Sequence, residues 1–125
     1  MIKAELMYTK SHEWLKDLGD GTFEVGISDH AQEELGDLVF VNLPEVGDGC
    51  EAGEPIADVE SVKAVSDVNS PVTGTVSEIN EVLLDTPEAI NQDAYAAWFC
   101  RVKDVSDKGD LMDAAAYEAF LAEEA

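Results

Sequence analysis

The sequence predicts a single, mainly β domain with short helices inside it and a longer helix at its C-terminal end. From Tyr8 to about Val76, short apolar segments are separated by Gly, Pro, Asp and Asn, which is typical of strands joined by tight turns. Near the end, Met112, Ala116 and Phe120 recur with helical spacing instead. The 125 residues are 46% hydrophobic and contain no low-complexity linker, so we expect one domain over residues 1–125.

Seven segments carry the apolar and β-branched residues that strands favour. In chain order they are Tyr8–Lys16, Thr22–Ser28, Asp37–Asn42, Pro55–Glu60, Val65–Asn69, Gly74–Ile79 and Phe99–Val105. The first two are expected to form a hairpin through Leu18–Gly21, because the Asp-Gly pair there supplies the positive φ of a tight reversal.

Three helices are predicted from the residues at their ends. A helix over Asp29–Leu35 begins at an Asp N-cap and stops at Gly36. A second short helix is expected over Thr86–Asn91, with Pro87 at the first position after a Thr cap. The last helix is expected over about Asp113–Glu123, and its apolar stripe should cover an edge of the sheet.

The chain is strongly acidic, since 28 Asp and Glu against 7 Lys and Arg give a net charge of −21. Nucleic acids and anionic membrane surfaces attract Lys and Arg, so neither is an expected partner. Such a charge serves solubility or docking to basic partner surfaces, and both interpretations stay open. No stretch has the pattern of a signal peptide or a membrane span, so we expect the protein in the cytoplasm, or in the mitochondrial matrix if a transit peptide has been removed.

Lys63 is the only basic residue between positions 17 and 100. It lies in the short reversal between Pro55–Glu60 and Val65–Asn69, which can pair as the strands of a hairpin within about residues 55–71. A lysine at such a tip is ordinarily only solvated. A modifying enzyme could nevertheless find it by shape, because functional residues often lie on loops held by a rigid scaffold.

The hairpin and its flanks resemble a lipoyl-attachment site. Glu60 lies three residues before Lys63, Gly47 sixteen before it and Gly74 eleven after it. Biotin carriers are similar in fold, but their lysine usually lies between methionines, and here its neighbours are valine and alanine. The comparison favours lipoate.

The resemblance extends well beyond the hairpin. YTKSHEW at residues 8–14, VGISDHAQEELGDLVFVNLPEVGD at 25–48 and DAAAYEAFL at 113–121 are similar to the glycine cleavage system H protein family. The resemblance runs from about Tyr8 to Glu124. It implies a barrel-sandwich hybrid of the lipoyl/biotinyl type, which is two small sheets packed face to face with short helices.

The resemblance implies a lipoylated carrier and not an enzyme. Lipoic acid would be joined to Lys63 as an amide by a lipoate ligase or lipoyl transferase, with Glu60 as a recognition determinant. In the family, the arm takes the aminomethyl group of glycine from the P protein (glycine decarboxylase) to the T protein (aminomethyltransferase). The L protein (dihydrolipoyl dehydrogenase) then reoxidises it. Family residues that hold the loaded arm match Ser11, Glu13 and Asp67.

Three other interpretations stay open. An enzyme could use His12-Glu13 and Asp29-His30, but there is no nucleophile elbow and the two histidines lack the spacing of a zinc motif. We therefore expect neither a catalytic residue nor a metal site. An unmodified acidic interaction module would explain the charge but not the lysine hairpin. An H-like protein could instead donate lipoate to other lipoyl domains.

Some residues depart from the family pattern or have bland explanations. Ala94–Trp98 lacks the proline and glycines usual before the final strand, so this loop need not keep the geometry usual in the family. Gly47 and Gly74 are expected to be turn glycines. Cys100 is expected to be a small buried hydrophobe, whereas Cys50, beside turn glycines, is expected to be exposed.

Overall fold

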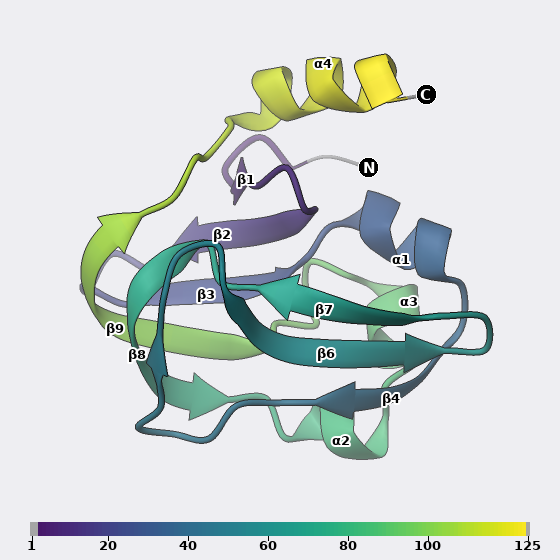
Figure 1. The fold of residues 1–125 in the computed structure, drawn as a ribbon, viewed down its shortest axis with the longest axis horizontal. Coiled ribbons are helices and arrows are strands. Elements are labelled where there is room, and N and C mark those ends of the chain that lie inside the picture. The colour runs from purple at the N-terminus through teal and green to yellow at the C-terminus, as the bar shows by residue number, and fades with distance from the viewer. Residues whose placement is uncertain (1–2, 125) are drawn as a thin grey trace.

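The computed structural model describes residues 3–124, which form two antiparallel sheets with helices at their margins (Figure 1). The strands are β1 Met7–Tyr8, β2 Glu13–Asp17, β3 Phe23–Ile27, β4 Leu38–Asn42, β5 Gly49–Cys50, β6 Pro55–Ser61, β7 Val65–Asn69, β8 Val72–Ile79 and β9 Cys100–Lys108. The helices are α1 Asp29–Leu35, α2 Val82–Asp85, α3 Ala89–Gln92 and α4 Ala114–Glu124. The mainly β prediction with short helices and a C-terminal helix is confirmed.

The larger sheet has the order β1-β2-β3-β9-β8-β5. Its first two strands correct the sequence prediction, because Tyr8–Lys16 is not one strand. The chain reverses between Tyr8 and Glu13, so that Tyr8 pairs with Trp14 and Met7 with Leu15. His12 ends this reversal with φ of 73°, a left-handed conformation that non-glycine residues seldom adopt.

The smaller sheet has the order β4-β6-β7 and contains the predicted hairpin. β6 and β7 pair antiparallel, with Glu60 opposite Val65 and Asp58 opposite Asp67. The other edge strand, β4, carries an irregularity between Leu38 and Phe40, where two register steps on β4 face one on β6. A bulge of this kind turns consecutive side chains outward.

Apolar packing joins the two sheets. Val59 and Val68 of the smaller sheet are buried in one cluster with Ile27 of β3 and with Phe99, and this cluster is closed by residues from α2 and α3. A second buried cluster lies within the curled larger sheet. A third lies under α4, where Tyr117 stacks on Tyr8 with ring centroids 4.3 Å apart. The expectation that the C-terminal helix covers an edge of the sheet is confirmed, because α4 lies beside the edge strand β1 (Figure 1).

The helix ends differ in detail from the predicted ones. Ser28, not Asp29, is the N-cap of α1, since its hydroxyl accepts from the backbone N–H of Ala31 at 3.2 Å. Gly36 ends that helix as predicted, with φ of 82°. The second predicted helix is wrong at its start. The prediction starts this helix at Thr86, but in the structure α2 precedes it. Thr86 is the C-cap of α2, and the N-cap of α3 is Glu88.

Four further expectations concern small residues. Gly47 has φ of 98°, as a turn requires, but Gly74 lies inside β8, where an added Cβ would be 2.6 Å from the carbonyl oxygen of Lys103. Gly74 is therefore needed for close strand packing, which corrects its assignment to a turn. Cys100 is buried as predicted. The expected exposure of Cys50 is wrong, because β5 pairs with β8 and the Cys50 side chain is 9% exposed.

The loop before β9 is well anchored despite its missing glycines. The indole N–H of Trp14 donates to the carbonyl of Ala94 at 3.1 Å, and the Arg101 guanidinium lies 4.2 Å from the ring centroid of Trp98. Among residues 3–124, no helix is long and apolar enough to span a membrane.

Candidate functional site

Lys63 lies at the turn of the β6–β7 hairpin, at the end farthest from the bend that leads into β8 (Figure 1). The turn is closed by a backbone bond from Ser61 N–H to the carbonyl of Ala64, at 2.8 Å. The Ser61 hydroxyl oxygen also accepts from the N–H groups of Ala64 and Lys63, at 3.0 and 3.3 Å. These bonds hold the exposed lysine on a defined turn, as the sequence predicts.

The turn is also tied to the end of α1. Val62 N–H donates to the carbonyl of Asp37 at 3.2 Å. A Cβ built on Gly36 would lie 3.4 Å from Cε of Lys63, so the lysine side chain passes the C-terminal end of α1. The partial negative charge of a helix C-terminus favours an ammonium there, and acylation of the amine would remove that attraction.

Exposed apolar side chains surround the base of the turn. Val62 and Val65 are 71% and 69% exposed, and the bulge in β4 places Val39 and Phe40 outside as well, at 54% and 45%. Glu60 is exposed between Phe40 and Val65, its partners across the sheet. Large apolar groups at this density indicate a contact surface and not only a solvated tip.

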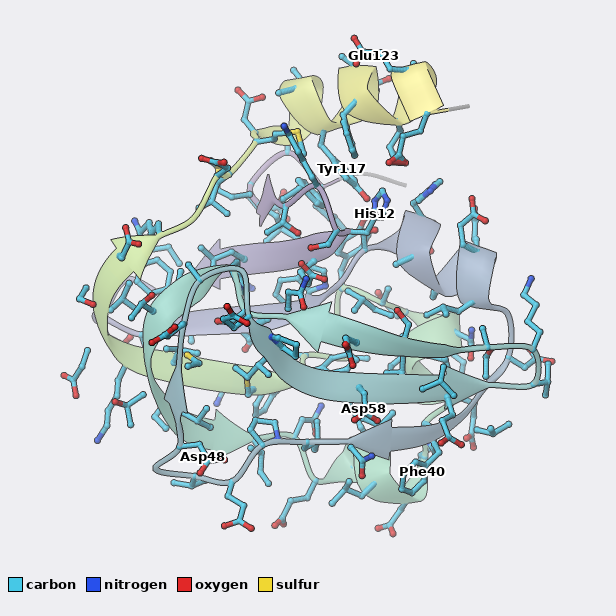
Figure 2. The ribbon with its side chains drawn as sticks, viewed as in Figure 1. His12, Phe40, Asp48, Asp58, Tyr117 and Glu123 are labelled. Carbon is cyan, nitrogen blue, oxygen red and sulfur yellow. The ribbon has the colours of Figure 1, made fainter. Side chains whose placement is uncertain are left out.

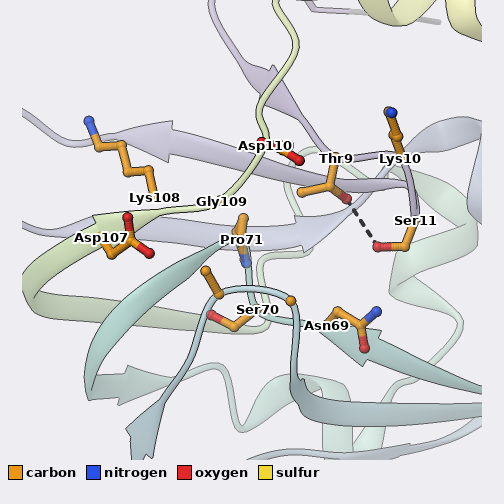
Figure 3. A pocket seen from close by; sticks show the side chains of 12 residues that line it. Thr9, Lys10, Ser11, Asn69, Ser70, Pro71, Asp107, Lys108, Gly109 and Asp110 are labelled. Atoms are coloured by element: carbon orange, nitrogen blue, oxygen red, sulfur yellow. Dashed lines mark hydrogen bonds between the residues drawn. The ribbon is translucent and has the colours of Figure 1, made fainter.

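A cavity of about 630 Å³ lies at the other end of β7 (Figure 3). Its wall is built from the reversal at residues 9–11, residues 52–53, residues 69–71 and residues 107–110. Ser11 is on this wall, and its hydroxyl oxygen is 3.3 Å from that of Thr9. Asn69 is six residues after Lys63, a distance of about 20 Å along an extended strand.

Glu13 lies directly behind the cavity wall and is 1% exposed. Its Oε1 accepts from the hydroxyls of Thr9 and Ser11, both at 2.6 Å, and its Oε2 accepts from the N–H of Asn69 at 3.3 Å. Burial raises the pKa of this carboxyl, and the hydroxyl bonds oppose that shift. Glu13 therefore orients the two hydroxyls without itself reaching the surface.

Asp67 occupies a different place. It lies on the outer face of the smaller sheet opposite Asp58, and it lines a separate hollow of about 250 Å³. The structure thus brings Ser11 and Glu13 together but does not place Asp67 on their cavity wall. Thr9 and Asn69 stand there instead. Asn69 could have been found from the sequence, because it lies two residues after Asp67 on the same strand, and side chains two residues apart point to the same face.

The fold and the lysine together define a class of protein. Two antiparallel sheets packed on each other, with an exposed lysine at a hairpin turn, form a barrel-sandwich carrier domain of the lipoyl/biotinyl type. A family model described as "Glycine cleavage H-protein" matches residues 6–124. The chain belongs to the glycine cleavage H-protein family.

Individual relatives agree with this assignment over nearly the whole length. The glycine cleavage system H protein of Lachnoclostridium phytofermentans is 55% identical over 123 residues, which cover 98% of this chain and 97% of that protein. The protein of the same name from Vibrio parahaemolyticus is 57% identical over 122 residues, covering 95% and 97%. A crystal structure of a glycine cleavage system H protein from Mycobacterium marinum matches with a TM-score of 0.89 and 39% identity, covering 98% of each chain. This likeness confirms the predicted fold class.

Proposed function

We propose that Lys63 carries lipoic acid as an amide and that the protein is the carrier component of a glycine cleavage system. The observation that carries the proposal is the exposed lysine on a hydrogen-bonded hairpin turn, in a chain of the H-protein family. No other lysine or arginine lies between residues 17 and 100. When attached, the dithiolane of lipoate supplies the sulfur to which the aminomethyl group of glycine is transferred.

The residues near Lys63 fit an attachment site. The ammonium is in water, so the loss of its charge on acylation leaves no buried ion pair broken. The apolar side chains around the turn offer contact area to a lipoate ligase or lipoyl transferase. We infer that Glu60, exposed among them, is the charged determinant that such an enzyme reads.

The protein supplies position and no chemistry of its own in this proposal. Its partners are the P, T and L proteins of glycine cleavage, and we expect it to work in the cytoplasm, since the relatives named above are bacterial. The acidic surface, at −21, favours partners with basic docking sites over nucleic acid.

We infer that the cavity beside Ser11 shelters the carried amine. The hydroxyl of Ser11 is exposed there, and the carboxylate of Glu13 behind it provides negative charge in a place of reduced water access. Ser11→Ala and Glu13→Gln should each speed the loss of the aminomethyl group from the loaded protein while lipoylation at Lys63 proceeds normally. A loss rate equal to that of the wild type would contradict this role. Asp67→Asn tests the third residue on the same assay.

The first experiment is an intact mass of the protein after incubation with lipoate, ATP and a lipoate ligase, followed by peptide mapping. One lipoyl group on Lys63, absent from Lys63→Arg, is the expected result. Glu60→Gln should slow the reaction, whereas Glu54→Gln, the same change just before the start of β6, should not. An unmodified Lys63, under conditions that load a known acceptor, would leave the acidic interaction module as the better interpretation.

A second assay separates the two carrier functions. Exchange of labelled bicarbonate into glycine with a P protein is expected from the lipoylated form. If the lipoylated protein fails in this assay but transfers its lipoyl group to other lipoyl domains in the presence of a transferase, the relay function replaces glycine cleavage.

A further inference from the structure

Two histidines and a glutamate that are far apart in the chain meet on the side of the molecule covered by α4. His12 lies in the reversal before β2, His30 in the first turn of α1, and Glu124 at the end of α4. The two imidazole rings have centroids 4.8 Å apart, and one ligand atom from each of the three residues lies within 4.8 Å of the others. Figure 2 shows His12 beneath α4 and beside α1.

The ring of His12 is held in one orientation by buried hydroxyls. Its Nδ1 is 2.8 Å from the hydroxyl of Tyr117, and that hydroxyl is 2.7 Å from Oγ of Ser28. Both Tyr117 and Ser28 are completely buried. The opposite nitrogen, Nε2, consequently faces the open side, where it lies 3.3 Å from a carboxylate oxygen of Glu124.

This arrangement matches the way proteins prepare a histidine for a metal ion. A metal-binding histidine usually donates its second ring N–H to a fixed acceptor, which sets the tautomer and the ring plane. With a cation on Nε2, Nδ1–H of His12 would donate to the Tyr117 oxygen, and Tyr117 would donate to Ser28. The contacts permit that direction, because either hydroxyl of the Tyr117–Ser28 pair can be the donor.

We propose that His12, His30 and Glu124 bind one first-row transition dication of the zinc class. Two imidazoles and one carboxylate are a common ligand set for Zn²⁺, with a fourth position left for water. Ligand atoms about 2.0–2.2 Å from the ion lie about 3.3 Å apart in a tetrahedron. His12 and Glu124 are already at this spacing, so the remaining separations need to close by at most about 1.5 Å. All three side chains are partly exposed, at 20% for His12, 30% for His30 and 40% for Glu124, so they can make this movement.

The ion would join α4 and α1 to the reversal that carries Ser11 and Glu13. These segments are separated by as many as 112 residues, from 12 to 124, and few backbone bonds link α4 to the rest of the fold. A bound ion therefore stabilises the docked helix, because it binds the folded chain better than the unfolded one.

The test uses the full-length, metal-free protein, titrated with Zn²⁺ by calorimetry in physiological salt. We expect one ion per chain and a melting temperature that rises with zinc. His30→Gln and Glu124→Gln should each weaken zinc binding by more than about 10-fold. About 10-fold is the smallest loss expected when only a residue that supports a ligand is removed, and these two changes remove a ligand itself. Glu123→Gln is the matched control, because it removes the same charge from the same helix, and Glu123 points away from His12 (Figure 2).

Cobalt(II) absorption identifies the ligands independently. A d–d band without a sulfur charge-transfer band is expected from this site. A sulfur band would assign the ion to Cys50 or Cys100 and overturn the proposal. Equal zinc binding by wild type, His30→Gln and Glu124→Gln would overturn it as well, and so would the absence of saturable binding to the wild type.

Discussion

Gly26→Ala should destabilise the protein far more than an ordinary glycine replacement in a strand. Gly26 lies on β3 opposite Trp14 on β2, and the indole covers the glycine. A Cβ added at Gly26 would lie 2.5 Å from Cε2 and Cζ2 of Trp14 and 2.6 Å from its Nε1. Carbon atoms in contact are ordinarily about 3.5–4.0 Å apart. The indole or the strand would therefore have to move by about 1 Å.

The cost follows from what holds the indole. Trp14 is completely buried, and its N–H donates to the carbonyl of Ala94 at 3.1 Å, so a displacement of the ring lengthens this bond. Overpacking a core costs about 1–3 kcal/mol, and the weakened buried hydrogen bond adds about 1 kcal/mol. We expect a loss of about 2–4 kcal/mol in the free energy of unfolding. For a domain of this size, the melting temperature should fall by roughly 10 °C.

Urea unfolding followed by far-UV circular dichroism measures this loss, and Gly49→Ala is the matched control. Gly49 is also in a strand, but an added Cβ there would meet no atom within 4 Å. Both replacements restrict the unfolded chain equally, so their difference reports the contact with Trp14. A difference below about 1 kcal/mol, which is the lower limit for overpacking, would refute the steric argument.

Three other predictions follow from buried groups. Burial raises the pKa of Glu13, so the contribution of Glu13 to stability should be greatest below the ordinary pKa of glutamate and should fall as the pH rises through the raised pKa. In urea titrations, the difference in unfolding free energy between wild type and Glu13→Gln should therefore shrink or reverse as the pH rises over that range. A difference independent of pH would contradict this. Tyr117→Phe keeps the stacked ring but loses both hydroxyl bonds, and should lower the free energy of unfolding by about 1–3 kcal/mol; a loss under about 0.5 kcal/mol would argue against a role for the hydroxyl. Burial raises the pKa of the Cys100 thiol to about 12, and Cys50 is covered by β8, so neither should react with Ellman's reagent until denaturant is added; rapid reaction of the native protein would show that one of them is accessible.

Local chemistry was enough to predict the lysine hairpin. β7 has the predicted bounds, and β6 extends only one residue past its predicted end. Alternating apolar residues and a short reversal are sufficient there, because both strands are neighbours in the chain and their register depends on the turn between them. For the same reason the stop of α1 at Gly36 was predictable, since only a residue tolerant of positive φ ends a helix in this way.

The reversal between β1 and β2 could not be predicted in this way. Tyr8–Lys16 reads as one strand, because Tyr8, Thr9 and Trp14 favour extended backbone and no glycine or proline interrupts the segment. The chain turns since buried Glu13 draws the hydroxyls of Thr9 and Ser11 toward itself, and since Tyr8 and Trp14 are both completely buried. Those interactions require the finished core around them.

The sequence thus contained the fold class, the charge and the place of the exposed lysine, all of which depend on composition and on neighbours along the chain. The folded chain alone brought His12 to His30 and Glu124, and joined Asn69 to Glu13. Contacts between residues so far apart form only when burial of the core offsets the entropy of closing long loops, and no local pattern records which residues then meet.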